Sequence, residues 1–495
     1  MTDGLAPGTM ETGLLTDLYQ LTMACGYWKH GHAEREAVFH LTFRRAPFGG
    51  GYAIAAGLAP ALDYLRALHF GSDDLAYLAT LRDRTGAALF PQGFLDYLGA
   101  LRFTCTVDAM LEGTLAFAHE PLVRVRGPIL QAQIVETALL AIINYQTLVA
   151  TKAARVCQAA RGAPVLEFGL RRAQGVDGAL SGSRAAYIGG VAATSNVLAG
   201  KRFGIPVAGT HAHSWVMFHD GELEAFRAYA DAMPGNCTLL VDTYDSLDGV
   251  RHAIAIGREL RAHGHELAGV RLDSGDLAHL SAEARRLLDD AGFPDAKIVA
   301  SNDLDEHLIA SIVDQGARID SWGVGTKLVT CFDQPALGGV YKLGAHRDAR
   351  GAWRDVLKLS EQPVKISNPG VLQVRRLRRD GWLTGDIIYD SERGLTARHA
   401  GSGGIDLYEI EDPNRPPVTP ASDGGEDLLV TVLERGAPTA VDLSLASART
   451  RAAAQLAQLS PRTKRFLNPQ PHPVGLDRHV HDRKQQLIAE ARARA

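Results

Sequence analysis

Cysteine, long apolar runs and targeting signals are scarce or missing in this chain of 495 residues. Its five cysteines are scattered, odd in number and never spaced as C-x-x-C, which excludes a disulfide framework and a zinc ribbon. No uninterrupted apolar run approaches the roughly 18 to 20 residues that cross a bilayer. The first residues also lack the basic and apolar regions of a secretory signal. We therefore expect a cytoplasmic protein with reduced thiols and no membrane partner.

An excess of one charge is missing as well. The formal net charge is −4, and charged residues make up 22% of the chain. This balance gives no reason to expect nucleic acid as a partner. With 46% hydrophobic residues the chain can form two or three domains with a large core. The expected ligand is a small molecule.

The pattern of strands and helices divides the chain into a middle and two flanks. Residues 1–128 alternate apolar strands with helical patterns and predict an α+β domain. Residues 129–345 begin with a long helical pattern to residue 160 and then predict an α/β domain. Residues 346–495 hold short β-like segments and a helical tail, and we expect them to complete the flanking domain. The elements predicted in the flanks are a helix over 14–23, strands over 38–43, 110–117, 122–125, 353–359 and 371–374, and a helix from 446.

Six apolar strands alternate with helical patterns in the middle of the chain, over residues 164–168, 206–209, 238–241, 269–272, 297–300 and 319–324. Such alternation predicts parallel strands with crossover helices, in either an open doubly wound sheet or a barrel. Polar residues follow every strand, and a ring of them around one mouth favours the barrel. Since only six strands are visible, we expect an irregular α/β barrel.

The segment Gly204–Val216 carries an apolar strand into two histidines, His211 and His213. Side chains alternate along a strand, so both imidazoles are expected to point the same way. Two other strands, in Glu167–Gly175 and Gly269–Asp276, also end in charged residues and glycine. Together they indicate an anion-binding site at one end of the sheet.

Eight blocks stand in order along the chain: Thr16–Met23, Glu167–Gly175, Ser195–Gly200, Gly209–Ser214, Gly269–Asp276, Gly323–Thr326, Gln334–Leu343 and Leu467–Pro471. In these blocks the chain resembles the nicotinate phosphoribosyltransferase family. The resemblance implies an irregular α/β barrel with a flanking domain, the type II phosphoribosyltransferase fold. It implies an ATP-coupled ligase that makes nicotinate mononucleotide from nicotinate and phosphoribosyl diphosphate, the first step of NAD synthesis from nicotinate. It also implies Mg²⁺ and a homodimer with shared active sites.

The resemblance further implies roles for single residues. His213 is expected to be the phosphorylated histidine that couples ATP hydrolysis. The residues expected to hold nicotinate are Tyr19, Thr210, Arg271 and Arg171, with Tyr19 supplied by the partner subunit. Thr326 is expected to contact phosphoribosyl diphosphate.

The residue types suit this chemistry in their own right. Loss of diphosphate from an anomeric carbon passes through an oxocarbenium-like state. Asp242 and Asp273 could favour positive charge on the sugar, and Mg²⁺ on Asp273 and Asp276 could neutralise the leaving group. The planar fork of Arg271 can recognise the carboxylate that distinguishes nicotinate from its amide. Tyr19 can stack on a flat ring.

Glycines and polar residues after the later strands suggest where phosphate binds. Glycine lets backbone N–H groups approach a phosphate, and a Thr hydroxyl can add to them. No G-x-x-x-x-G-K-[ST] sequence occurs, so the loop is not a Walker loop. The residues expected to bind phosphoribosyl diphosphate are Thr326, Gly323, Gly325, Asn302, Gly338 and Gly339.

Alternatives remain open at this stage. Tyr19 could be a core residue of an amphipathic helix, the glycines could form an ordinary turn, and Asp242 and Asp303 could be helix caps. His211 with His213 could bind a metal, as in metal-dependent amidohydrolases on a barrel. A non-catalytic homologue, and an enzyme that takes nicotinamide or quinolinate as acceptor, are further possibilities.

Overall fold

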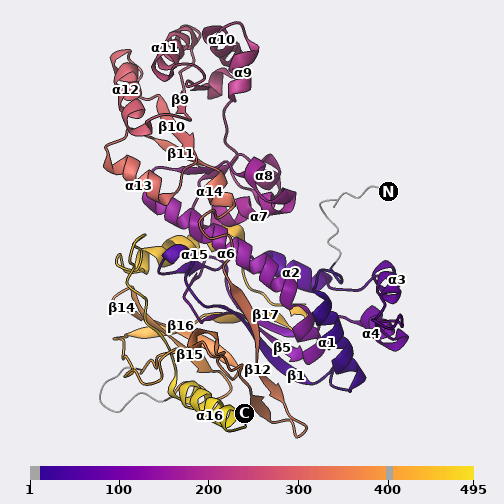
Figure 1. The fold of residues 1–495 in the computed structure, drawn as a ribbon. Helices are drawn as coiled ribbons and strands as arrows, with labels where there is room; N and C mark the ends of the chain where they lie inside the picture. The colour runs from indigo at the N-terminus through magenta and orange to yellow at the C-terminus, as the bar shows by residue number, and fades with distance from the viewer. Residues whose placement is uncertain (1–11, 397–404, 495) are drawn as a thin grey trace. The chain divides into compact units, whose positions relative to one another are not determined.

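The computed structural model describes residues 12–396 and 405–494 (Figure 1). It forms two compact units, the first from residues 1–147 and 336–495 and the second from residues 148–335. The sequence pattern predicts boundaries at 128/129 and 345/346. The chain first passes from one unit to the other inside helix α6 (Glu136–Ala159). No linker marks this point in the sequence, because the helical pattern continues through it.

The second unit is built on a parallel sheet of six strands in the order β7-β6-β11-β10-β9-β8. The strands are β6 (Val165–Glu167), β7 (Ala193–Thr194), β8 (Thr238–Leu240), β9 (Gly269–Leu272), β10 (Lys297–Asn302) and β11 (Ser321–Val324). Five of the six predicted strands are confirmed.

The predicted strand over 206–209 is wrong. This segment makes only a single parallel bridge, between Val207 and Thr194. Pro206 has no N–H to donate to a sheet, which limits pairing here. The strand in this part of the sheet is β7. It has only two residues, which are too few to show the alternation of apolar side chains that identifies a strand in a sequence.

Helices connect these strands in the expected alternation. They are η2 (Leu170–Arg172), α7 (Gly175–Ile188), α8 (Val197–Phe203), α9 (His213–Phe218), α10 (Glu222–Ala232), η3 (Pro234–Asn236), α11 (Ser246–Ala262), α12 (Leu277–Asp290), α13 (Glu306–Asp314) and α14 (Thr326–Val329). The carboxylates of Asp245 and Asp305 cap α11 and α13. The suggestion that Asp242 and Asp303 are the caps is therefore wrong.

The two edges of this sheet, β7 and β8, are not paired with each other in the described parts of the chain. The side chain of His211 links the segment that follows the Val207 bridge to β8. Its Nε2 accepts a hydrogen bond from the backbone N–H of Leu240 at 3.1 Å. The α/β class is confirmed, while closure of the sheet into an irregular barrel stays a prediction.

The first unit contains a seven-stranded sheet in the order β13-β12-β1-β5-β3-β17-β18, antiparallel throughout. Its strands are β1 (Glu36–Phe43), β3 (Thr106–Met110), β5 (Pro121–Pro128), β12 (Gly339–Arg347), β13 (Trp353–Asp355), β17 (Leu429–Glu434) and β18 (Ala437–Pro438). Strand β12 follows the second unit in the chain yet pairs with β1. This pairing confirms a flanking α+β domain made by both ends of the chain.

Two smaller sheets complete the first unit. One has the order β16-β14-β15-β19, and the other pairs β2 with β4. Their strands are β2 (Ala53–Ile54), β4 (Leu115–Ala116), β14 (Leu372–Arg379), β15 (Trp382–Asp390), β16 (Gly424–Asp427) and β19 (Val474–Leu476). The predicted strand over 110–117 is wrong, since a turn at residues 112–113 separates β3 from β4.

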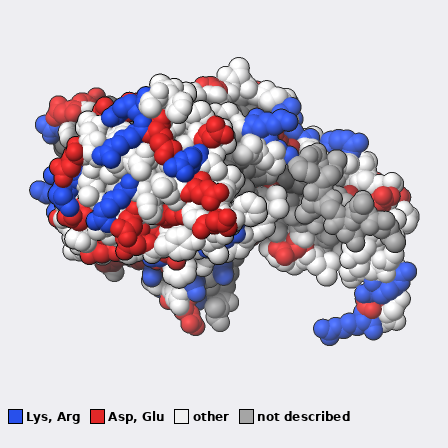
Figure 2. Space-filling model, turned by 90° about the horizontal axis from the view of Figure 1, so that it is seen from above, with Lys and Arg blue, Asp and Glu red and all other residues white. Residues whose placement is uncertain are grey.

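The helices of the first unit are α1 (Leu18–Lys29), η1 (Pro47–Gly49), α2 (Leu58–Ala67), α3 (Ser72–Thr80), α4 (Gln92–Ala100), α5 (Ile129–Ile134), η4 (Pro363–Lys365), α15 (Leu445–Gln458) and α16 (Arg478–Arg494), with the first part of α6. In the described residues no helix is both long and apolar enough to cross a membrane. On the face shown in Figure 2, basic and acidic side chains are interspersed, in keeping with the small net charge.

Candidate functional site

Polar side chains from several strands of the second unit converge on a cavity of about 150 Å³. The carboxyl ends of parallel strands share one edge of a sheet, which is where ligands bind in α/β proteins. Residues that end or follow β6, β9, β10 and β11 form the lining: Phe168, Arg171, Arg172, Arg271, Asp273, Ser301, Asn302, Asp303, Gly323, Gly325 and Thr326. Seven residues predicted from the sequence to act in the site are therefore brought together here.

Arg271 is held by three hydrogen bonds. Its Nε donates to Ser301 Oγ at 2.7 Å, one terminal nitrogen to Thr210 Oγ1 at 3.1 Å, and the other to Asp273 Oδ1 at 2.9 Å. The guanidinium carbon lies 5.5 Å from the centre of the Phe168 ring. Because a guanidinium has five N–H groups, each terminal nitrogen keeps one for a ligand. The side chain is thus a pre-oriented fork.

Asp273 connects Arg271 to His213. Its Oδ1 also accepts a short hydrogen bond from Ser301, and its Oδ2 lies 3.7 Å from Nε2 of His213. Burial opposes ionisation, but the hydrogen bonds from Ser301 and Arg271 and the charge of Arg271 outweigh it and hold the pKa of Asp273 below its ordinary value. Asp273 is therefore a carboxylate at neutral pH.

Asp242 supports the same turn from the end of β8. Its Oδ2 accepts from the backbone N–H of Asp273 at 2.9 Å and from the Ser274 hydroxyl at 2.6 Å. Its Oδ1 is buried and has no hydrogen-bond partner in the described structure. A buried carboxylate oxygen without a partner is costly in an otherwise satisfied site, so this atom is available to a ligand or a cation.

His213 and His211 have opposite environments. His213 is the first residue of α9, with a side chain 41% exposed and Nδ1 at 3.1 Å from Thr243 Oγ1. His211 is buried and bonded to Leu240. The expectation that the two histidines end a strand is wrong, because residues 208–212 form a loop and His213 begins α9. Only His213 is open to a substrate.

The glycines beside the cavity are required by packing. A Cβ on Gly323 would lie 2.6 Å from the ring of Phe168, and one on Gly325 would lie 3.0 Å from the Phe168 carbonyl oxygen. Thr326 starts the short helix α14 directly after them. Lys327 is not available as a free charge, since it pairs with Asp305 at 2.6 Å.

Three predicted site residues belong to the first unit. Tyr19 lies on α1 and is 49% exposed, so its alternative as a core residue is wrong. Gly338 and Gly339 lie at the start of β12, where a Cβ on Gly339 would lie 2.1 Å from the amide oxygen of Asn144.

Asp276, the second predicted metal ligand, belongs to the second unit. It accepts a hydrogen bond from the backbone N–H of His279 and caps α12.

Three contacts escaped sequence analysis: Phe168 beneath Arg271, Ser301 between Arg271 and Asp273, and Thr243 beside His213. Phe168 had a usable signal, because it directly follows β6 inside the Glu167–Gly175 block. Ser301 is a small polar residue within a buried strand, and only the pairing of β10 with β9 puts it beside Arg271.

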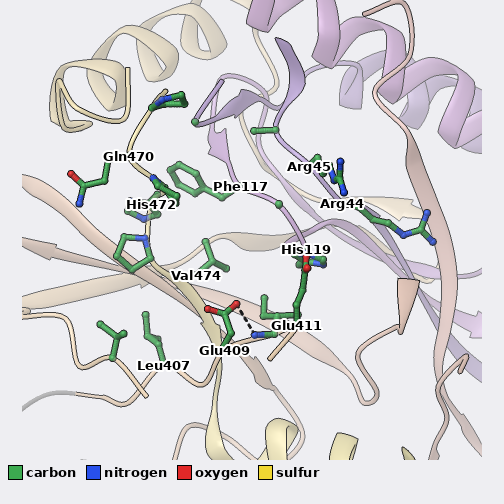
Figure 3. Close-up of a pocket in the computed structure, with 18 of the residues that line it drawn as sticks. Arg44, Arg45, Phe117, His119, Leu407, Glu409, Glu411, Gln470, His472 and Val474 are labelled. Atoms are coloured by element: carbon green, nitrogen blue, oxygen red, sulfur yellow. Dashed lines mark hydrogen bonds and ion pairs between the residues drawn. The ribbon is translucent and has the colours of Figure 1, made fainter. Parts of the chain in front are cut away.

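A larger cavity, of about 630 Å³, lies within the first unit (Figure 3). Phe117 and His472 line it and stack with ring centres 4.0 Å apart. Two of its polar pairs satisfy each other, because His119 hydrogen-bonds to Glu411 and Arg415 forms an ion pair with Glu409. None of the site residues predicted from the sequence lines it.

The fold and the smaller cavity together are typical of a class: α/β enzymes with a polar ligand site at the carboxyl edge of a parallel sheet. Sequence models of the nicotinate phosphoribosyltransferase (NAPRTase) N-terminal domain, family and C-terminal domain match residues 14–144, 164–356 and 373–484. The chain therefore belongs to the nicotinate phosphoribosyltransferase family.

Individual relatives agree over nearly the full chain. A nicotinate phosphoribosyltransferase of Bacillus subtilis is 44% identical, over 97% of this chain and 96% of its own. The human enzyme of that name is 37% identical, over 96% of each chain. A crystal structure of human nicotinic acid phosphoribosyltransferase superposes with a TM-score of 0.83 at 33% identity, over 96% of this chain and 100% of that one. These relationships exclude the amidohydrolase alternative.

Proposed function

We propose that the protein joins nicotinate to the ribosyl group of phosphoribosyl diphosphate and couples this step to ATP hydrolysis, as a ligase. The pyridine nitrogen of nicotinate bonds to the anomeric carbon while the bond from that carbon to diphosphate breaks. The observation that carries the proposal is the linked set of Arg271, Asp273 and His213, in which Arg271 and Asp273 line the cavity and His213 lies beside Asp273. Full-length similarity to enzymes named for this reaction supports it.

Arg271 is the residue that would recognise nicotinate. Its free N–H groups can form a paired contact with a carboxylate, which an amide cannot match. Thr210 Oγ1 fixes the same guanidinium and could also contact the ring substituent. Because Asp273 already balances the charge of Arg271, the exposed Arg171 in the cavity lining would supply further positive potential.

The other wall of the cavity would bind phosphoribosyl diphosphate. Thr326 offers a hydroxyl, and Gly323 and Gly325 line the same wall without side chains. Asn302 adds an amide at the end of β10, and Arg172 adds a second exposed guanidinium. This set suits the charge of a diphosphate leaving group.

The residues fit a magnesium ion. Mg²⁺ commonly uses one or two protein carboxylates together with substrate phosphates. Asp242, with its unpartnered Oδ1, and Asp273 would hold it here. Asp276 is a weaker candidate because the cap of α12 engages one of its oxygens. When bound, the ion would neutralise charge on the departing diphosphate.

His213 would couple the reaction to ATP. Its imidazole nitrogen would bond to the γ-phosphorus while the bond to ADP breaks, and water would later release the phosphoryl group as inorganic phosphate. The half-exposed imidazole is accessible. Thr243 and Asp273 fix the ring and would stabilise positive charge on it.

We further propose a cytoplasmic homodimer with shared sites. Tyr19, exposed on α1, would stack on nicotinate bound by the partner subunit. Gly338 and Gly339 would contact the phosphates of phosphoribosyl diphosphate. The test mixes Tyr19→Ala with Arg271→Ala subunits. Hybrids should recover part of the activity that each parent lacks, and no recovery would contradict shared sites.

The proposed reaction is tested by offering nicotinate, nicotinamide or quinolinate in parallel, with phosphoribosyl diphosphate and Mg²⁺, each with and without ATP. Mononucleotide should form selectively from nicotinate and faster with ATP. Preference for either other acceptor would overturn the substrate, and an equal rate without ATP would overturn the coupling.

A further inference from the structure

His211 occupies a gap at the edge of the parallel sheet. Strand β8 pairs with β9 on one side only, in the described residues. On the open side the backbone N–H of Leu240 donates to Nε2 of His211 at 3.1 Å, in a buried contact. The imidazole therefore takes the place of a strand partner and satisfies a donor that would otherwise be costly to bury.

The ring is fixed from two further sides. Tyr229 on α10 meets it edge to face, with ring centres 4.7 Å apart, and Phe226 lies 6.0 Å away. Nδ1 lies 3.4 Å from the carbonyl oxygen of Ala212. Because Nε2 accepts a hydrogen bond, the ring must be neutral with its hydrogen on Nδ1. Burial is the main cause that lowers the pKa of His211, and nearby Arg271 and His213 act in the same direction.

The residues on either side of this contact reach the candidate site. Thr210 accepts from Arg271 at 3.1 Å, and His213 lies 3.1 Å from Thr243. Thr243 follows Leu240 by three positions. The bond from Leu240 to His211 thus ties the loop that carries His213 to the strand end that carries its partner.

We propose that His211 is a positioning residue, which fixes the Thr210–His213 segment against the end of β8 so that His213 is held for phosphoryl transfer. This inference rests on the proposed function, because it assigns the purpose of the contact to that step. A metal-binding role does not fit, since Nε2 is already engaged and no group of three potential metal-binding side chains exists in the described parts of the chain.

The test compares two replacements of the same side chain. His211→Phe keeps an aromatic ring without an acceptor, whereas His211→Gln can place an oxygen near the position of Nε2. The matched control is His263→Phe, a surface histidine of the same unit, bonded at Nδ1 to the Glu259 carbonyl. Each variant is assayed for acid-labile labelling by ATP and for the ratio of nucleotide formation with and without ATP.

His211→Phe should lower labelling and the ATP-stimulation ratio by about 10- to 100-fold, the scale expected for a misplaced catalytic group. His211→Gln should restore most of both, and His263→Phe should match the wild type. Undiminished stimulation in His211→Phe would overturn the proposal. An equal loss in His211→Gln would also overturn it, because ring packing rather than the acceptor would then matter.

A readout independent of activity separates this inference from the proposed function. Nitrogen-15 spectra of histidine-labelled protein should show a neutral His211 with its hydrogen on Nδ1. The His213 signals should shift in His211→Phe and not in His263→Phe. Unchanged His213 signals would refute the positioning role even in an active enzyme, whereas a wild type without ATP-dependent labelling would refute the proposed function.

Discussion

The two cavities of the molecule differ in size and in what surrounds them. The cavity of the first unit holds about 630 Å³ and that of the second about 150 Å³. Beneath the larger one, Arg376 and Asp386 form a buried ion pair, and Nε2 of the lining residue His472 has no hydrogen-bond partner in the described structure. Around the smaller one, Arg271, Asp273 and Asn302 meet at the ends of neighbouring parallel strands. The convergence of polar side chains from several strand ends, rather than volume, marks the candidate functional site.

The largest expected effect concerns stability near the larger cavity. Arg376 and Asp386 form a fully buried ion pair at 2.6 Å, and Arg376 lies over the Phe117 ring. Asp386→Asn removes the carboxylate that pairs with this buried guanidinium, so the free energy of unfolding should fall by about 3–5 kcal/mol. Denaturant titration measures it. Asp63→Asn, which removes only an exposed pair with Arg66, should cost no more than about 1 kcal/mol.

Activity per folded molecule should be unchanged in Asp386→Asn. A variant that is stable but inactive would contradict the distinction between the two cavities, because the larger cavity would then serve the reaction.

The pH dependence of stability gives a second test of this buried ion pair. Burial alone would raise the pKa of Asp386, but Arg376 and His472 hold it well below its ordinary value.

This depressed pKa sets the direction of the pH effect. The carboxylate of Asp386 stabilises the folded state fully above the unfolded-state pKa of about 3.9 and loses that contribution as the pH falls further. The stability difference between wild type and Asp386→Asn should therefore shrink below about pH 4. A difference that grows under acid would contradict the assignment.

The next effect concerns catalysis at the smaller cavity. Arg271→Ala should lower kcat/KM for nicotinate by about 100-fold or more, as expected when a charged donor is removed from a shielded site. Arg45→Ala, at the larger cavity, is the matched control and should stay within about twofold. Steady-state assays at varied nicotinate measure both. Equal losses in the two variants would remove the distinction between the cavities.

A smaller effect is expected at Asp242. Asp242→Asn keeps the shape of the side chain but weakens its contribution to a cation, so the Mg²⁺ concentration for half-maximal activity should rise by about 10-fold. The control is Asp245→Asn, which alters the exposed cap of α11 and not the cavity. A Mg²⁺ requirement that stays unchanged in Asp242→Asn would exclude this residue as a ligand.

The smallest effect tests packing beside the cavity. Gly323→Ala places a methyl group against Phe168 and should lower the free energy of unfolding by about 1–3 kcal/mol. Thermal unfolding measures it, and Phe168→Leu combined with Gly323→Ala should restore part of the loss. Gly235→Ala, where the added atom meets nothing within 4 Å, is the control. No loss in Gly323→Ala would show that Phe168 moves freely.

Much of this site could be predicted from local sequence. Parallel strands that end in polar residues must gather them at one edge, which is why Arg271, Asp273 and Asn302 were expected together. The direction of His211 could not be predicted, because its partner Leu240 lies 29 residues away and a loop has no period. The strand predicted over 206–209 is wrong for the same reason. Whether Val207 pairs depends on Thr194 in β7 and not on the apolar residues beside it.

The most direct measurement of the central claim is to locate the phosphate that ATP transfers to the protein. Radiolabelled ATP should give an acid-labile phosphate on the peptide that contains His213. His213→Ala should lose the label and the ATP stimulation but keep slow, ATP-independent transfer to nicotinate. Label on another residue, or undiminished stimulation in His213→Ala, would contradict the account.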